Sequence, residues 1–214
     1  MVVAMNTPRE TLIGILVSCL LAGAAPGCSR GSEAEAPAAV KTTDAPQRAM
    51  VAGTAAPGAI VTLDPVSPRE FTAPGDARVM DQFGQQFLPG LLVVQAGQRV
   101  EFRSSEDVLH NVRVDEVGTR APVFNVATPP FEAYTHTFDK PGYYNVSCDI
   151  HPAMHANIFV SRTPYTAVAD ATGAFSIANV EPGSYTARAF SGGAPTERSV
   201  DVTAPRTQLA FGQP

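Results

Sequence analysis

Four potential metal ligands occur at a spacing that few folds can satisfy. Cys148, His151 and Met154 form a C-x2-H-x2-M run on one short segment, and His110 lies 38 positions before the cysteine. A thiol, two imidazoles and a thioether are the ligand types of a blue-copper electron-transfer site. A β-sandwich brings them together when the end of one strand and a hairpin loop meet at the same pole. The spacing therefore predicts a sandwich with one copper ion at one end.

Short apolar segments separated by turn residues also favour an all-β fold. Residues 59–63, 91–94, 100–103, 134–138 and 143–147 are apolar or alternate between apolar and polar side chains. The 19 prolines and 17 glycines lie largely between such segments. This pattern is typical of strands in a sandwich. No segment after the N-terminal apolar stretch has the 3.6-residue period of an amphipathic helix.

Length and charge limit the classes of protein. With 214 residues and 44% hydrophobic residues, the chain can form one large or two small domains. The net charge is −5 and the lysines and arginines do not cluster. We therefore expect no nucleic-acid partner.

The first 28 residues predict an export signal. Arg9 precedes the apolar run 12–22, which is too short to span a bilayer, and small residues follow before Cys28. Cys28 resembles the lipid-acceptor cysteine of bacterial lipoproteins; Cys19 and a simple cleaved signal are the alternatives. Residues 29–48, rich in Ala, Pro, Ser and charge, predict a flexible tether. The expected location is the periplasm or cell surface, with a lipid anchor in a bacterial membrane.

Cysteine usage separates Cys148 from the other two thiols. Cys19 and Cys28 belong to the N-terminal segment, so Cys148 is the lone thiol of the folded part and has no partner for a disulfide. In an exported protein, metal ligation is the most economical purpose for such a residue. The alternative is an ordinary buried core cysteine.

Residues 69–160 resemble a known family of copper proteins. The loop C-D-I-H-P-A-M at 148–154, the segment L-H-N-V at 109–112 and the segment F-x-x-P-G-Y-Y at 138–144 resemble cupredoxins of the plastocyanin/amicyanin group. The resemblance implies a Greek-key sandwich. It also implies copper with His110, Cys148 and His151 as in-plane ligands and Met154 as the axial ligand.

The same resemblance assigns roles to neighbouring residues. Asn111 would tie the two ligand loops together near the Cys148 sulfur. Electrons would pass through His151, exposed within an apolar patch that includes Leu109, Pro152 and Ala153. The partners would be a redox donor and a redox acceptor that the sequence does not identify.

Other ionisable residues near the proposed site receive plainer interpretations. His155 is expected at the surface, with replacement of Met154 as axial ligand as the alternative. His136 is expected to be a packed or exposed strand residue. Asp149, Glu106 and Asp107 are expected to be solvated loop charges, or else carboxylates that dock a positively charged partner.

The C-terminal part has a separate signature. The pattern D-x-x-G-x-F-x-I-x-x-V-x-P-G-x-Y, from Asp170 to Tyr185, resembles the carboxypeptidase-regulatory-like, transthyretin-type β-sandwich. The opening segment of that family has its nearest match at residues 53–63, before the copper region. We therefore predict a discontinuous second sandwich, formed by residues 49–68 and 161–214, with a cupredoxin domain over 69–160 inserted in it.

The sequence predicts an exported type 1 copper protein that carries one electron between redox partners, with one copper per chain, as a monomer. We expect no enzyme activity, because no Ser-His-Asp or paired-carboxylate arrangement is evident. The alternatives are a periplasmic copper chaperone, for which Met-rich or His-rich tracts would be expected, and a non-redox interaction module at residues 161–214. The membrane contact would be the lipid anchor alone.

Overall fold

Sixteen β-strands and no helix make up residues 47–212, the part of the chain that this computed structural model describes. The all-β prediction is confirmed. The predicted export signal, with Cys28, lies outside the described residues, as does the predicted tether except for its last two residues. Within the described range, no helix has the length and hydrophobicity to cross a membrane.

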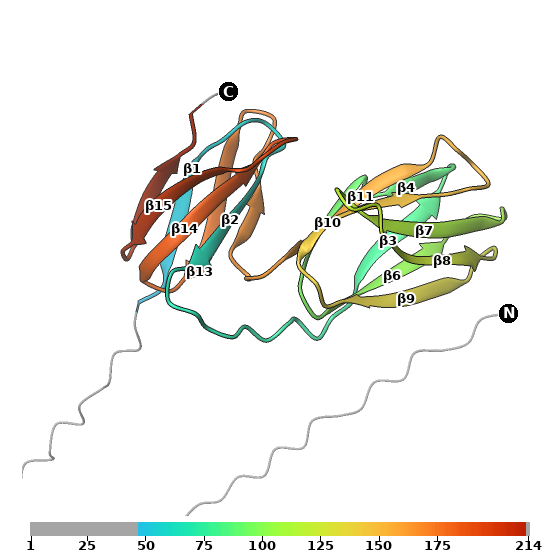
Figure 1. The fold of residues 1–214 in the computed structure, drawn as a ribbon, viewed down its shortest axis with the longest axis horizontal. Coiled ribbons are helices and arrows are strands. Elements are labelled where there is room, and N and C mark those ends of the chain that lie inside the picture. The colour runs from blue at the N-terminus through green and yellow to red at the C-terminus, as the bar shows by residue number, and fades with distance from the viewer. Residues whose placement is uncertain (1–46, 213–214) are drawn as a thin grey trace, which may run out of the picture. The chain divides into compact units, whose positions relative to one another are not determined.

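Nine strands form what we call the central sandwich, residues 78–161. One sheet has the order β5-β11-β10-β7-β8 and the other has the order β4-β3-β6-β9 (Figure 1). The strands are β3 (Arg78–Phe83), β4 (Gln86–Leu88), β5 (Leu91–Gln95), β6 (Gln98–Ser104), β7 (His110–Glu116), β8 (Pro122–Thr128), β9 (Ala133–Phe138), β10 (Gly142–Ser147) and β11 (His155–Ser161).

Alternation along the strands places the core of the central sandwich between its two sheets. On β6, Val100 and Phe102 are fully buried while Arg99 and Arg103 are exposed. On β10, Tyr144 and Val146 are buried against the same cluster. Each such apolar side chain contributes about 1.5–3 kcal/mol when it is removed from water. The period-2 pattern of the sequence thus determines which side chains face the opposite sheet.

The remaining strands form the terminal sandwich, residues 49–65 and 166–210. Its two sheets have the orders β13-β1-β16 and β12-β2-β14-β15. The strands are β1 (Ala49–Thr54), β2 (Ile60–Pro65), β12 (Thr166–Val168), β13 (Ala174–Val180), β14 (Gly183–Phe190), β15 (Thr196–Val202) and β16 (Arg206–Ala210).

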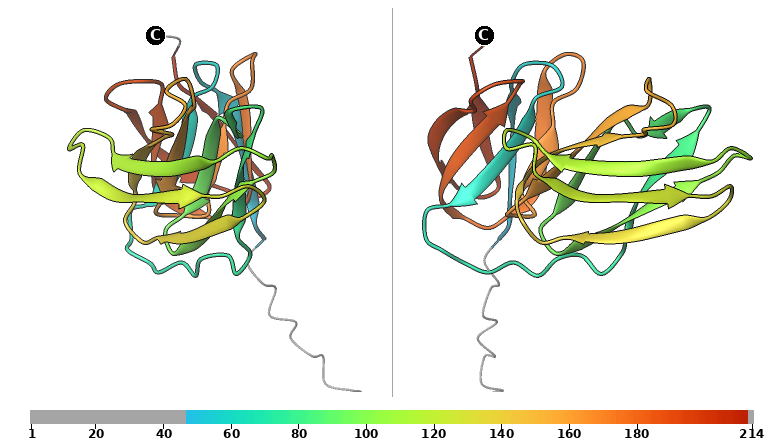
Figure 2. Two further views of the ribbon diagram at one scale, coloured as in Figure 1. Left: turned by 90° about the vertical axis from the view of Figure 1, so that its right-hand side faces the viewer. Right: turned by 45° about the vertical axis from the view of Figure 1, so that its right-hand side comes forward.

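The terminal sandwich is discontinuous in sequence. β1 pairs with β13 and β16, and β2 pairs with β12 and β14. Figures 1 and 2 show the same arrangement, with the blue and cyan first strands lying among orange and red ones. Its core is a separate hydrophobic cluster that includes Val51 and Leu63 from the N-terminal strands and Tyr185 and Leu209 from the C-terminal ones. Residues more than 100 positions apart therefore complete one core.

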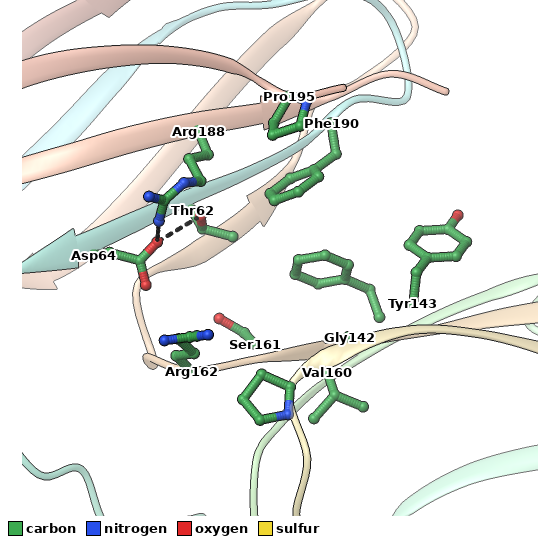
Figure 3. Close-up of a pocket in the computed structure, with 12 residues that line it drawn as sticks. Thr62, Asp64, Gly142, Tyr143, Val160, Ser161, Arg162, Arg188, Phe190 and Pro195 are labelled. Atoms are coloured by element: carbon green, nitrogen blue, oxygen red, sulfur yellow. Dashed lines mark hydrogen bonds and ion pairs between the residues drawn. The ribbon is translucent and has the colours of Figure 1, made fainter. Parts of the chain in front are cut away.

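A charged cluster links three adjacent strands of the terminal sandwich. Arg188 of β14 and the Thr62 hydroxyl both donate to Asp64 of β2 (Figure 3). Arg188 also donates to Glu197 of β15. Arg188 is opposite Thr62 on one side and Glu197 on the other. Cross-strand pairs of opposite charge stabilise a particular register of strands by a few tenths of a kcal/mol to about 1 kcal/mol each.

Each sandwich contains a buried tyrosine in the same local arrangement. The Tyr144 hydroxyl donates to the Lys140 carbonyl and the Tyr185 hydroxyl donates to the Glu181 carbonyl, both at 2.7 Å. Both tyrosines end an x-P-G-x-Y segment, in which Pro-Gly turns the chain into a strand. A tyrosine bonded to the backbone a few residues upstream is a recurrent corner of Greek-key sandwiches.

Tyr185 is expected to make the terminal sandwich sensitive to alkali. Burial, reinforced by the neighbouring Tyr165, raises the pKa of Tyr185 to about 12. In the unfolded chain Tyr185 ionises near the ordinary tyrosine pKa of about 10. The stability that its burial contributes is therefore fully present below about pH 10 and is lost as the pH rises towards about 12. Urea denaturation from pH 8 to 12 should show this loss in the wild type and a flatter profile in Tyr185→Phe. Tyr134→Phe is the control, and an unchanged slope in Tyr185→Phe would contradict the assignment.

Candidate metal centre

Strand order brings two distant segments to one end of the central sandwich. β7 and β10 are antiparallel neighbours, with Ser147 opposite Arg113, so the start of β7 lies beside the end of β10. His110 is the first residue of β7, and Cys148 directly follows the last residue of β10. The loop at residues 148–154 then connects β10 to β11. We call this end of the sandwich the metal pole.

Three of the four predicted ligands converge there. The ligand atoms of His110, Cys148 and His151 all lie within 4.8 Å of one another. The two Nδ1 atoms are 3.0 Å apart, and the Cys148 Sγ is 3.8 Å from the His151 Nδ1. His110 and Cys148 are buried, whereas His151 is half-buried. A soft sulfur and two imidazole nitrogens that face one point are a donor set that fits copper.

The fourth predicted ligand is on the same short loop. Met154 is 1% exposed and belongs to the core cluster that contains Cys148. Its N–H donates to the His151 carbonyl at 2.9 Å, and its carbonyl accepts from the Cys148 N–H at 3.3 Å. These two bonds close the loop into a compact turn. An axial role for Met154 remains a prediction.

The Asn111 amide connects the two ligand segments as predicted. Its Oδ1 accepts hydrogen bonds from the Cys148 thiol at 3.3 Å and from the Asp149 N–H at 2.7 Å. The Ile150 N–H adds a longer contact of 3.4 Å. One side chain on β7 therefore holds the first residues of the loop at 148–154, which follows β10.

Glu106 orients the His110 ring, a role that the sequence analysis did not assign. Its Oε1 lies 2.8 Å from the His110 Nε2 and also accepts from the Gln85 N–H, while Oε2 accepts from the Gly84 N–H. A carboxylate at Nε2 requires the proton on that nitrogen, which leaves the Nδ1 lone pair directed at the site. The prediction of a solvated loop charge is wrong for Glu106.

The same contacts act on the ionisation of Glu106. Burial would raise the pKa of this carboxyl, but hydrogen bonds from Gln85, His110 and Gly84 outweigh it and hold the pKa below its ordinary value. A carboxylate that stays ionised is a permanent acceptor for the His110 ring.

Asp149 is also more than a solvated charge. Its Oδ2 accepts from the side-chain amides of Asn125 at 2.8 Å and Asn111 at 3.1 Å, and Arg113 lies 3.6 Å from Oδ1. The pKa of Asp149 is lowered, first by the Asn125 hydrogen bond, with further contributions from Arg113 and Asn111 that outweigh partial desolvation. Asn125 lies on β8, and nothing in its local sequence indicated this contact.

The other two histidines lie outside this cluster. His155 begins β11 and is exposed, although Met154 beside it is buried. His136 is half-buried on β9, with its ring 4.7 Å from that of Phe124 and 4.8 Å from that of Phe138. Burial lowers the pKa of His136, and the nearby Asp139 opposes that effect. His136 is thus a packed strand residue.

Comparison with known families agrees with this geometry. Residues 77–161 match the family model for copper binding proteins of the plastocyanin/azurin family. This part of the chain is a cupredoxin domain. All three converging ligands and Met154 lie within the matched residues. Residues 153–210 match a second model, described as domain II of polysaccharide lyase family 4, and the transthyretin-type resemblance remains a prediction.

Several solved structures are similar to the cupredoxin domain. Amicyanin from Paracoccus versutus is 24% identical over 47% of this chain and 97% of its own, with a TM-score of 0.37. A purple cupredoxin from Nitrosopumilus maritimus is 20% identical over 39% of this chain and 99% of its own, with a TM-score of 0.35. The copper-containing nitrite reductase of Thermus scotoductus is 28% identical over 47% of this chain but 26% of its own, with a TM-score of 0.38. No curated protein sequence matches the chain.

Proposed function

We propose that the cupredoxin domain carries one electron between redox partners at a single copper ion bound by His110, Cys148 and His151, with Met154 as the axial ligand. The observation that carries this proposal is the convergence of one nitrogen from each of two imidazoles and one thiol sulfur, all within 4.8 Å of one another. Copper in such a site supplies a one-electron couple between Cu(I) and Cu(II).

The surrounding residues hold the ligands in one geometry. Glu106 fixes the His110 tautomer, Asn111 holds the turn after Cys148, and two backbone bonds close the loop that carries His151. Ligands that move little between oxidation states keep the reorganisation cost of electron transfer small. The thiol proton must leave before the sulfur can bind the metal, so binding is favoured as the pH rises.

An apolar surface around His151 supports contact with a redox partner. Leu109 is 50% exposed and Ile150 is 46% exposed, and both are next to a ligand in sequence. Phe131 is 69% exposed on the loop after Thr128, which is opposite His110 in the β7–β8 pair. Its φ of +60° is uncommon for a bulky residue. Exposed apolar groups gathered at one pole mark an interaction surface.

Substitution of Leu109 by lysine is expected to slow electron self-exchange by at least about tenfold, because two copies must bring their metal poles together and like charges would then face each other. Line broadening in mixtures of reduced and oxidised protein measures this rate. Val123→Lys is a matched control, because Val123 is 38% exposed near the opposite end of β8. Equal rates in Leu109→Lys and the wild type would show that electrons do not cross this surface.

Voltammetry tests electron carriage itself. A reversible one-electron wave from the copper-loaded protein is the expected result. Binding of Cu(I) without such a wave would favour the copper-chaperone alternative. We propose a carrier rather than an enzyme, because the site geometry accounts for metal binding and electron passage without a substrate position.

We further propose that the protein is exported, monomeric and anchored by lipid at Cys28 to a bacterial membrane, with residues 29–48 as the tether. The support is the sequence of residues 1–48. We also propose that the terminal sandwich is of the carboxypeptidase-regulatory-like, transthyretin type. In its support, Asp170 Oδ1 accepts from the Thr172 and Ala174 N–H groups, so the D-x-x-G segment forms a tight turn.

A further inference from the structure

Three side chains from three different segments form a closed ring of hydrogen bonds beside Cys148. Asn111 Nδ2 donates to Asn125 Oδ1 at 2.8 Å and to Asp149 Oδ2 at 3.1 Å. Asn125 Nδ2 donates to the same Asp149 oxygen at 2.8 Å. Asn111 is on β7, Asn125 is on β8, and Asp149 is the second residue of the loop at residues 148–154.

The ring determines which way the Asn111 amide points. An ionised carboxylate only accepts hydrogen bonds, so Asp149 takes the NH2 group of Asn125. With that group engaged, Asn125 presents its oxygen to Asn111. Asn125 Oδ1 therefore accepts from the NH2 group of Asn111. The Asn111 Oδ1 consequently faces the loop at residues 148–154.

The opposite orientation of Asn111 would break the contacts at the metal pole. Oδ1 now accepts from the Cys148 thiol and from the Asp149 and Ile150 N–H groups. A rotated amide would place its own donors against these donors. The orientation of the Asn111 amide therefore decides whether these contacts form. It is set by Asp149 and by Asn125, which makes no hydrogen bond to a proposed ligand.

We propose that Asn125 is a positioning residue of the copper site: through Asp149 and Asn111 it holds the turn after Cys148 in its ligand-binding conformation. The inference rests on the proposed function in taking Cys148 as a copper ligand. Arg113 also helps to hold Asp149 in place, through an ion pair with 3.6 Å between its Nη1 and Asp149 Oδ1. Asn125 is solvent-exposed on β8, so its substitution leaves the core intact.

Hydrogen exchange in the copper-free protein tests the positioning role. Asn125→Ala should accelerate exchange of the Asp149 and Ile150 amides by about tenfold, because it removes both hydrogen bonds by which Asn125 holds Asn111 and Asp149 in place. Asn145→Ala is the matched control: Asn145 is exposed on β10 of the same sheet and makes no side-chain hydrogen bond among the described residues. It should leave both rates unchanged.

A double-mutant cycle distinguishes loss of the hydrogen-bond ring from a general loosening of the loop at residues 148–154. In an Asp149→Ala background, Asn125→Ala should change the two rates by less than about twofold, because the ring is already open. Wild-type rates in Asn125→Ala, or the same acceleration in both backgrounds, would overturn the proposal. In the copper-loaded protein, Asn125→Ala should also shift the reduction potential, since polar groups near the sulfur tune it.

The two proposals can fail independently. Exchange rates are measured without copper, so they report the ring even if the protein is not an electron carrier. A blue copper protein with unchanged exchange in Asn125→Ala would remove the positioning role alone.

Discussion

Replacement of Cys148 by serine is expected to lower the Cu(I) affinity by more than about a hundredfold, the upper range for loss of a residue that only supports a ligand. A hydroxyl is a poor ligand for Cu(I), whereas a thiolate is a strong one. The fold should persist, because a serine hydroxyl can donate to the Asn111 Oδ1 as the thiol does. Competition with a Cu(I) chelator measures the affinity.

Ser147→Ala is the control for this substitution. Ser147 precedes Cys148 at the end of β10, and successive residues of a strand face opposite sides of the sheet. It should bind copper as the wild type does. A Cys148→Ser protein that retains the wild-type affinity would mean that copper binds elsewhere.

Replacement of Gly53 by alanine is expected to destabilise the terminal sandwich by about 3 kcal/mol or more, at or beyond the usual cost of overpacking. A Cβ at this position would lie 1.5 Å from the Leu209 carbonyl oxygen, because β1 and β16 pair closely there. The obstacle is backbone, so no side-chain rotation relieves it. The two strands must separate, and β1 is the central strand of its sheet.

Hydrogen exchange of β13 and β16, together with urea denaturation, measures this effect. Gly193→Ala is the control: it lies in the same sandwich, has no positive φ, and a Cβ there would meet no atom within 4 Å. Unchanged exchange in β13 and β16 of Gly53→Ala would contradict the observed pairing. It would also remove the basis for a discontinuous sandwich.

The metal pole was largely predictable because its ligands lie on short sequence motifs. The C-x2-H-x2-M run places three residues on one loop. His110 starts an alternating segment, so its position at the same site followed once the strands β7 and β10 were neighbours. The Asn111 contact was available from the family resemblance. These features depend on local spacing and on one antiparallel pairing.

The supporting contacts were not predictable from local sequence. Glu106 contacts His110 four residues further along the chain, but its other partners are the backbone N–H groups of Gly84 and Gln85 in the turn between β3 and β4. Asn125 is an exposed residue of β8 whose partners come from two other segments. Which polar side chains meet at the end of a sandwich depends on loop conformation.

Some strands left no signal in the sequence. β15, at Thr196–Val202, has mostly exposed side chains and lies at the edge of its sheet. Its residues therefore lack the alternation that revealed β6 and β10. Charged residues on such an edge discourage pairing with other chains. Strands with little burial are specified by their neighbours rather than by their own pattern.

The optical and EPR spectra of the purified protein with one equivalent of Cu(II) test whether His110, Cys148 and His151 form a blue-copper site. The expected result is an intense visible thiolate-to-copper charge-transfer band with the small hyperfine splitting of a blue-copper site. A colourless protein, or one with the spectrum of ordinary tetragonal Cu(II), would contradict a site formed by His110, Cys148 and His151.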